Sequence, residues 1–129
     1  MAYALEQDPK LVTLLAGADL SAAKNLLVIG DSTDGRVVVA TATTDVLVGV
    51  VYENAEATAA GTPVRVAVSG IALVKAGGTV TRFTRQMFVT GAKCVDATGN
   101  VQTLGVALAS GVSGDLIPVL IRPESIGTA

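Results

Sequence analysis

Two stretches of the chain share one pattern, and this pattern decides the fold class. Residues 47–51 (LVGVV) lead through a linker of small residues to residues 61–66 (GTPVRV). Residues 103–107 (TLGVA) lead through a Gly/Ser linker to residues 117–121 (IPVLI). In both stretches a glycine stands among apolar residues, a loop follows, and a proline then opens an apolar strand. The repetition predicts a duplicated β-unit.

The spacing of four residues keeps the two copies in register. Gly49 and Gly105 are 56 positions apart, and Pro63 and Pro118 are 55 apart. A glycine inside a strand is typical of a bend or of a close backbone approach, so no Cβ is expected to fit at Gly49 or Gly105. Proline is tolerated at the first residue of a strand, where we place Pro63 and Pro118.

The composition favours strands over helices. Half of the 129 residues are hydrophobic, mostly small or branched, and only 3% are aromatic. Short strands separated by glycine turns predict an all-β fold, either a small β-barrel or a sandwich built from the duplicated units. Residues 19–24 and 53–60 are the places for at most one or two short helical turns.

A hairpin is expected near the start of the first unit. Residues 25–29 and 36–40 are two apolar strands, and Asp34-Gly35 between them is a strong turn signal because glycine accepts a positive φ. The loop lacks the alternating carboxylates and terminal glutamate of a calcium hand, so no metal is expected there. Residues 93–97 match residues 36–40 at an offset of 57, which extends the duplication.

The expected domain organisation is simple. Residues 1–12 lack periodicity and are interpreted as an extended N-terminal arm, residues 13–122 as a single β domain, and residues 123–129 as a loose tail. The first strand is expected at residues 12–16. Residues 79–88 carry both phenylalanines and two arginines with no clean apolar face, which favours an edge strand, either solvated or used to bind a partner.

The sequence contains no recognisable catalytic, metal or cofactor site. Histidine is absent, Cys94 is the single cysteine, and Gly111–Asp115 lacks the lysine of a phosphate loop. Glu53 and Glu56 are interpreted as a solvated face. The net charge of −2 with mixed signs favours neither nucleic acid nor an anionic membrane as partner. No signal-peptide pattern is present, so synthesis in a cytosol is expected. The expected protein is not an enzyme.

The order of these elements resembles that of the capsid cement, or head decoration, proteins of tailed bacteriophages. The family implies a small β-barrel that forms a homotrimer on the outer surface of a mature capsid and clamps neighbouring subunits of the major capsid protein. The resemblance also implies that the protein is synthesised in the host cytoplasm. Residues 83–87 depart from the family, which more often has a Gly/Asp turn there. The resemblance rests on the following segments: residues 24–40, 47–50, 60–67, 70–72, 101–107, 111–115 and 117–119.

The arm and the mixed strip at residues 82–88 are the expected contacts with a shell or a neighbouring protomer, because an arm can add main-chain hydrogen bonds to a partner's strand edge. Two other hypotheses stay open: a tail or baseplate β-domain, and a monomeric ligand-binding β-barrel. The candidate contact residues are Ala2, Tyr3, Ala4, Leu5, Leu11, Arg82, Phe83, Arg85 and Phe88.

Overall fold

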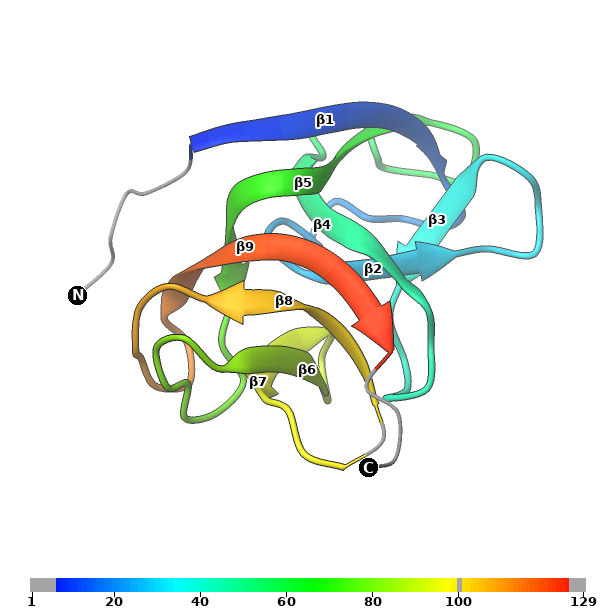
Figure 1. The fold of residues 1–129 in the computed structure, drawn as a ribbon. Helices are drawn as coiled ribbons and strands as arrows, with labels where there is room; N and C mark the ends of the chain where they lie inside the picture. Colours follow the sequence, from blue (N-terminus) through cyan, green and yellow to red (C-terminus); the bar gives the residue numbers. More distant parts are fainter. Residues whose placement is uncertain (1–6, 100, 126–129) are drawn as a thin grey trace.

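The described part of the chain folds into nine β-strands, and the expected all-β class is confirmed. The computed structural model describes residues 7–99 and 101–125, shown as a ribbon in Figure 1. No helix forms among these residues, and the segments considered for helical turns form hydrogen-bonded turns instead. The strands are β1 (Gln7–Ala16), β2 (Leu27–Gly30), β3 (Arg36–Val39), β4 (Leu47–Glu53), β5 (Pro63–Lys75), β6 (Arg85–Val89), β7 (Lys93–Asp96), β8 (Gln102–Ala107) and β9 (Leu116–Ser125).

All nine strands belong to one sheet in the order β1-β3-β2-β4-β5-β9-β8-β6-β7. A further pairing between β1 and β5 closes the first five strands into a ring. In this ring β1 runs parallel to β3 and antiparallel to β5. Glycine at position 35 turns the β2–β3 hairpin with a φ of 75°, as the Asp34-Gly35 pair predicts.

The strands in the second half of the chain pair with one another in the same pattern as the strands of this ring. Here β6 pairs with β7 and β8, and β8 pairs with β9, as β2 pairs with β3 and β4, and β4 with β5. The second half of β5 pairs antiparallel with β9, as β1 pairs with β5. A parallel bridge from Ala76 to Cys94 matches the pair of Ala16 with Val37. We call residues 11–67 unit 1 and residues 71–121 unit 2.

The longest strand, β5, therefore serves both units. Its first half, Pro63–Ala67, is the last strand of unit 1, and its second half, Ile71–Lys75, is the first strand of unit 2. Between them Gly70 has a φ of 84°, a conformation that glycine adopts without steric cost and that turns the strand where its partners change. Figure 1 shows β5 passing from the upper to the lower group of strands.

Three expectations from the sequence need correction. The first strand begins at Gln7, because residues 7–15 pair with β5, so the arm does not extend to residue 12. At the other end, β9 continues to Ser125, into the segment expected to be a loose tail. Pro63 and Pro118 are not equivalent. In the pairing of β5 with β4 and of β9 with β8, Ala67 and Leu120 occupy equivalent positions, which are 53 residues apart. Pro118 is therefore equivalent to Arg65 and not to Pro63.

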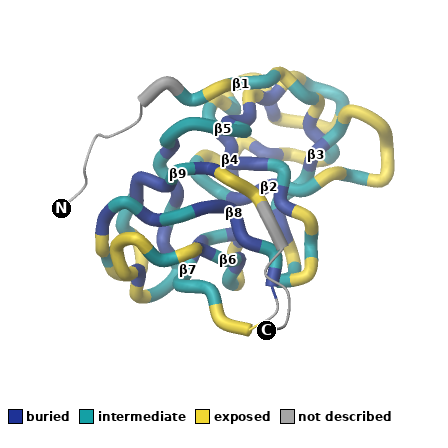
Figure 2. Tube along the Cα trace, in the orientation of Figure 1, coloured by how far each residue is buried: buried dark blue, intermediate teal, exposed yellow. Residues whose placement is uncertain are grey.

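The core is built mainly from small side chains that lie inside the two rings. One buried cluster fills the ring of strands in unit 1, which we call ring 1. A larger cluster fills the corresponding ring of unit 2, which we call ring 2, and the junction between the units. Figure 2 shows buried residues along the strands and exposed residues gathered at turns and loops. Equivalent positions carry similar residues, such as Val66 and Val119, but Val28 of ring 1 corresponds to the buried amide Gln86 in ring 2.

Candidate interaction surface

A hydrogen-bonded turn of unit 2 exposes Phe83 to solvent. The Phe83 N–H donates to the Ala107 carbonyl at 2.6 Å, and the Ala107 N–H donates to the Thr84 carbonyl at 3.0 Å. The neighbouring Arg82 N–H donates to the Ser110 hydroxyl at 3.0 Å. Two of these hydrogen bonds hold the backbone of this turn against the end of β8, and the third holds it to Ser110 in the loop that follows β8.

The backbone at Phe83 is in an unusual conformation. Its φ is 61°, in the left-handed region, and 71% of the residue is exposed to solvent. Bulky residues rarely occupy that region, whereas asparagine does so readily. The equivalent position of unit 1 is Asn25, with a φ of 66° and the matching hydrogen bond from its N–H to the Val51 carbonyl. Unit 2 thus holds an exposed aromatic residue where unit 1 has the residue that suits the backbone.

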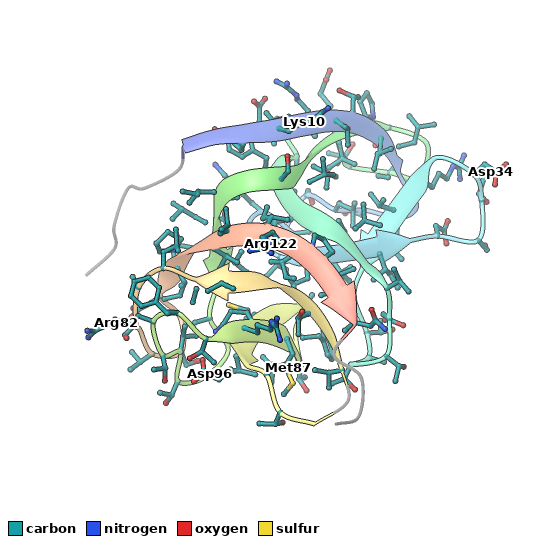
Figure 3. The ribbon with its side chains drawn as sticks, viewed as in Figure 1. Lys10, Asp34, Arg82, Met87, Asp96 and Arg122 are labelled. Carbon is teal, nitrogen blue, oxygen red and sulfur yellow. The ribbon has the colours of Figure 1, made fainter. Side chains whose placement is uncertain are left out.

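Two arginines are near Phe83 in the sequence, and an exposed valine lies on a neighbouring loop. Arg82 and Arg85 are exposed on either side of Phe83 in the sequence, and Arg82 points away from the body of the molecule (Figure 3). On the neighbouring loop Val112 is 61% exposed, and hydrogen bonds between Val80 and Gly111 tie that loop to the turn. We call Arg82, Phe83, Arg85 and Val112 the end surface.

A buried amide and a carboxylate support the turn from below. The Gln86 side-chain amide donates to the Thr84 carbonyl and to the Asp96 carboxylate, both at 3.0 Å. The same carboxylate accepts the Thr81 N–H at 2.9 Å. Burial acts to raise the pKa of Asp96, but the hydrogen bonds from Thr81 and Gln86 outweigh it and hold the pKa below its ordinary 3.8. The ionised carboxylate therefore helps to fix the start of the turn.

The mixed strip does not form the expected edge strand. β6 lies between β7 and β8: residues 86–89 pair with β7, and residues 85–87 pair with β8. Phe88 is only 9% exposed and packs in the core cluster, which removes it from the candidate contacts. Strand alternation explains the mixed pattern, because Gln86 and Phe88 face inward while Arg85 faces solvent.

The arm residues give a divided result. Ala2, Tyr3, Ala4 and Leu5 lie outside the described residues. Leu11 is half-buried, pairs with Ala67 in the sheet and packs against the core.

Both strand glycines lie where another backbone passes close by. An added Cβ at Gly49 would overlap the carbonyl oxygen of Ala67, and one at Gly105 would overlap that of Leu120. Gly49 and Gly105 occupy equivalent positions in the two units. At both positions the structure has the close backbone approach that a glycine inside a strand predicts.

A shallow hollow lies at the junction of the two units. It has a volume of about 200 Å³, and unit 1 contributes Lys24, Asn25, Tyr52 and Glu53 while unit 2 contributes Leu73 and Leu116. The sequence alone does not predict this hollow, because its walls come from segments that are far apart in the chain. Nor does the sequence predict the place of Val112 beside the turn, which depends on the pairing of two loops.

The described residues contain no group of three or more His, Cys, Asp or Glu side chains placed to hold a metal ion. Cys94 is buried, and burial raises the pKa of its thiol to about 12. Among residues 7–99 and 101–125, no helix has the length and hydropathy needed to cross a membrane.

Comparison with protein-family models and with the sequences of curated proteins finds no match for the chain.

Proposed function

We propose that the chain is a non-catalytic structural subunit that decorates the outer surface of a bacteriophage capsid as a homotrimer and stabilises it by bridging subunits of the major capsid protein. The proposal rests on the resemblance of the order of elements to capsid cement proteins. The end surface gives it independent physical support, because it has the composition of a protein contact. Aromatic residues and arginine are enriched at such contacts.

The observation that carries the proposal is the display of Phe83. A strained backbone conformation persists only where the surrounding structure enforces it, and such positions cluster at functional sites. An exposed aromatic ring in such a conformation contributes little to folding, whereas it can fill a pocket on a partner protein. A contact role explains why unit 2 keeps phenylalanine where unit 1 has Asn25.

The hollow that the described residues line at the unit junction gives less support to the ligand-binding alternative. Sites for small molecules are usually cavities of about 300–1,000 Å³ that enclose most of the ligand. The hollow at the unit junction measures about 200 Å³. It is too small for most metabolites but large enough for a single side chain of a protein partner. The tail or baseplate alternative shares the structural role and differs only in the surface that is bound.

The test is to incubate the purified protein with undecorated, expanded shells of a tailed phage and to measure its uptake by sedimentation. Saturable uptake at a fixed ratio of protein to major capsid protein is expected, together with a higher temperature of shell disruption. Shells that take up no protein would contradict the proposal. Uptake by purified tails or baseplates in place of shells would favour the other structural role.

The arm can be tested separately by a deletion that ends before β1. Residues 7–15 pair with β5, so removing them would damage the fold as well as any contact. Deleting residues 2–6 keeps that strand. We expect the shortened protein to melt at the wild-type temperature and to bind shells more weakly. Undiminished uptake would exclude a role for Ala2, Tyr3, Ala4 and Leu5 in binding.

A further inference from the structure

Unit 1 covers one face of unit 2 with the segment that leads into β2. The Lys75 N–H donates to the Asn25 carbonyl at 3.0 Å, and the Leu27 N–H donates to the Ala92 carbonyl at 2.8 Å. In the sheet Lys75 pairs with Leu116, which lines the hollow at the unit junction together with Asn25. The segment that includes Asn25 therefore lies against the pair of Lys75 and Leu116. We call this arrangement the inner contact.

The covered half of the inner contact has an open counterpart in unit 1. In the matching registers of β1 and β5, Leu15 takes the place of Lys75 and pairs with Pro63, which takes the place of Leu116. Leu15 is 40% exposed, and Pro63 is exposed as well. Side chains of residues directly opposite each other in a sheet lie on the same face, so the two form one apolar patch. We call Leu15 and Pro63 the start surface.

The covering half of the inner contact has its open counterpart in unit 2. Phe83 takes the place of Asn25, and Arg85 takes the place of Leu27 in the register of the paired strands. Phe83 and Arg85 are exposed, whereas Leu27 is buried and Asn25 is half-buried. The start surface and the end surface are thus the two halves of one contact, and each is open in the described part of the chain.

The backbone at the start surface is closed, which restricts how a partner can bind there. The Leu15 N–H donates directly to the Gly35 carbonyl at 2.9 Å. In unit 2 the equivalent groups, the Lys75 N–H and the Ala92 carbonyl, bind the inserted segment of unit 1 instead. A partner therefore meets the start surface through side chains and does not need to enter the sheet.

The residue types at the two open halves differ from those of the inner contact in a matched way. The inner contact joins two polar residues, Asn25 and Lys75. Both open counterparts are apolar, since Phe83 replaces the first and Leu15 the second. Together with Val112 on the end surface, they are three of the four large hydrophobic residues that are exposed among residues 7–99 and 101–125. Burial of apolar surface drives association, so each half has the composition that suits the other.

The two halves lie too far apart to meet within one chain. Arg82, next to Phe83, and Asp34, next to Gly35, are on opposite sides of the molecule in Figure 3. Gly35 is hydrogen-bonded to Leu15 of the start surface. The end surface can therefore cover only the start surface of another copy.

Charge favours the same arrangement. Unit 1 carries three basic and six acidic residues, a formal charge of −3, and unit 2 carries four basic and two acidic residues, a formal charge of +2. Arg82 lies next to Phe83 on the end surface, while Glu56 lines a small hollow together with Pro63 of the start surface. Opposite potentials steer association and set the orientation of the partners.

We propose that copies of this chain associate head to tail, with Phe83 of one copy packed on Leu15 and Pro63 of the next. Two different surfaces meet in such a contact, so repeated copies form a closed ring when the rotation between them allows it. The interface rests on the self-assembly part of the proposed function and requires no shell.

Cross-linking between two cysteine variants tests this interface. Lys24 and Leu73 line the same hollow at the inner contact. Arg82 is equivalent to Lys24, and Thr13 is equivalent to Leu73, so thiols at these two positions come together when copies associate as proposed. The pair is therefore Arg82→Cys on one chain and Thr13→Cys on the other. Cys94 is buried and does not interfere.

The expected rate follows from the effective concentration of the thiols. Paired copies raise it to the order of 1 mM, so a mixture at about 10 µM should form the mixed disulfide roughly 100-fold faster than random collision. Sedimentation of the wild-type protein at the same concentration shows whether the copies are associated.

Thr44→Cys supplies the control for random collision. Thr44 is exposed in the loop that follows β3, whereas Gly35 precedes β3. The adjoining Thr43 carbonyl accepts the Gln102 N–H at the start of β8, whereas the turn of Phe83 is bonded to the end of β8. A thiol at position 44 is therefore away from both surfaces.

Two matched variants introduce the residues of the inner contact at the open halves. Phe83→Asn keeps the fold because Asn25 has the same backbone conformation, and Leu15→Lys keeps it because Lys75 occupies the equivalent place in β5. We expect each to lower the rate of the mixed disulfide to that of the Thr44→Cys control. Because the two side chains act on each other, the double variant should lose no more than either single one.

Several results would overturn the interface: equal rates for Thr13→Cys and Thr44→Cys, a rate insensitive to Phe83→Asn or to Leu15→Lys, preferential disulfides between two Arg82→Cys chains, or a wild-type protein that sediments as a monomer at every concentration. Shell uptake without the mixed disulfide would overturn the interface alone. The mixed disulfide without shell uptake would contradict shell binding alone.

Discussion

Replacing Gly49 with alanine tests the close approach of β4 and β5. The new Cβ would overlap the carbonyl oxygen of Ala67 and stand 3.0 Å from a methyl carbon of Val66. The first of these atoms belongs to the main chain, so it can move away only if β4 and β5 separate. That movement disturbs the neighbouring pairs of Val50 with Ala67 and of Val51 with Val66.

The expected cost follows from these contacts. Overpacking a filled core costs about 1–3 kcal/mol. Weakening one backbone hydrogen bond adds about 1 kcal/mol. We therefore expect Gly49→Ala to lower the free energy of unfolding by about 3 kcal/mol, which corresponds to a fall in Tm of roughly 10–15 °C for a domain of this size. Gly105→Ala should cost a similar amount, because its Cβ would overlap the Leu120 carbonyl. Gly49→Val should cost more than Gly49→Ala.

The assay is thermal and urea unfolding followed by circular dichroism, with Gly30→Ala as the matched control. Gly30 lies in β2, and an added Cβ there meets no atom within 4 Å. That substitution should change stability by no more than about 0.5 kcal/mol. If Gly49→Ala melts within a few degrees of Gly30→Ala, the close approach does not limit the residue at this position, and the reasoning is refuted.

Three further predictions concern unit 2. Phe83→Asn should have a free energy of unfolding about 0.5–1 kcal/mol higher than that of Phe83→Ala, because asparagine adopts the left-handed backbone at a lower cost than alanine does; equal stabilities in urea would contradict the strain at Phe83. The Cys94 thiol, whose pKa burial raises to about 12, should react with a thiol reagent at pH 8 only as fast as the protein unfolds, and rapid labelling of the native protein would refute its burial. The pKa of Asp96 is lowered in the folded protein, so the ionised carboxylate stabilises the fold above pH 3.8, and this contribution is lost as the pH falls through the folded-state pKa. Asp96→Asn should therefore make the free energy of unfolding less dependent on pH in acid. Urea unfolding at pH 2–6 would show this difference.

The β1 strand shows why part of the duplication is not evident from the sequence. Residues 11–17 (LVTLLAG) and 71–77 (IALVKAG) are equivalent in the structure, and both end in Ala-Gly. Only this dipeptide and an apolar pattern are shared, and such patterns are common in strands. The match becomes certain only when both segments are seen to pair with equivalent strands.

The residues expected to form the contact surface were also only partly predictable from the sequence. Exposure of Arg82, Phe83 and Arg85 agrees with the expectation of a mixed strip, but Phe88 lies in the core. A sequence pattern of period two tells which residues share a face, yet it does not tell which strands flank that face. The partner strands β7 and β8 come from elsewhere in the chain, and they decide that β6 is an inner strand.

The sequence by itself determined the local features: the all-β class, the turn at Asp34-Gly35, and glycine at the two positions where no Cβ fits. These follow from side-chain size and backbone freedom, which belong to single residues. Only the tertiary structure decided that β5 serves two units, that Phe83 takes the place of Asn25, and that a hollow opens between the units. Those features depend on which distant strands pair, because hydrogen-bonding groups of the backbone are the same in every residue and only the packing of the whole chain selects their partners.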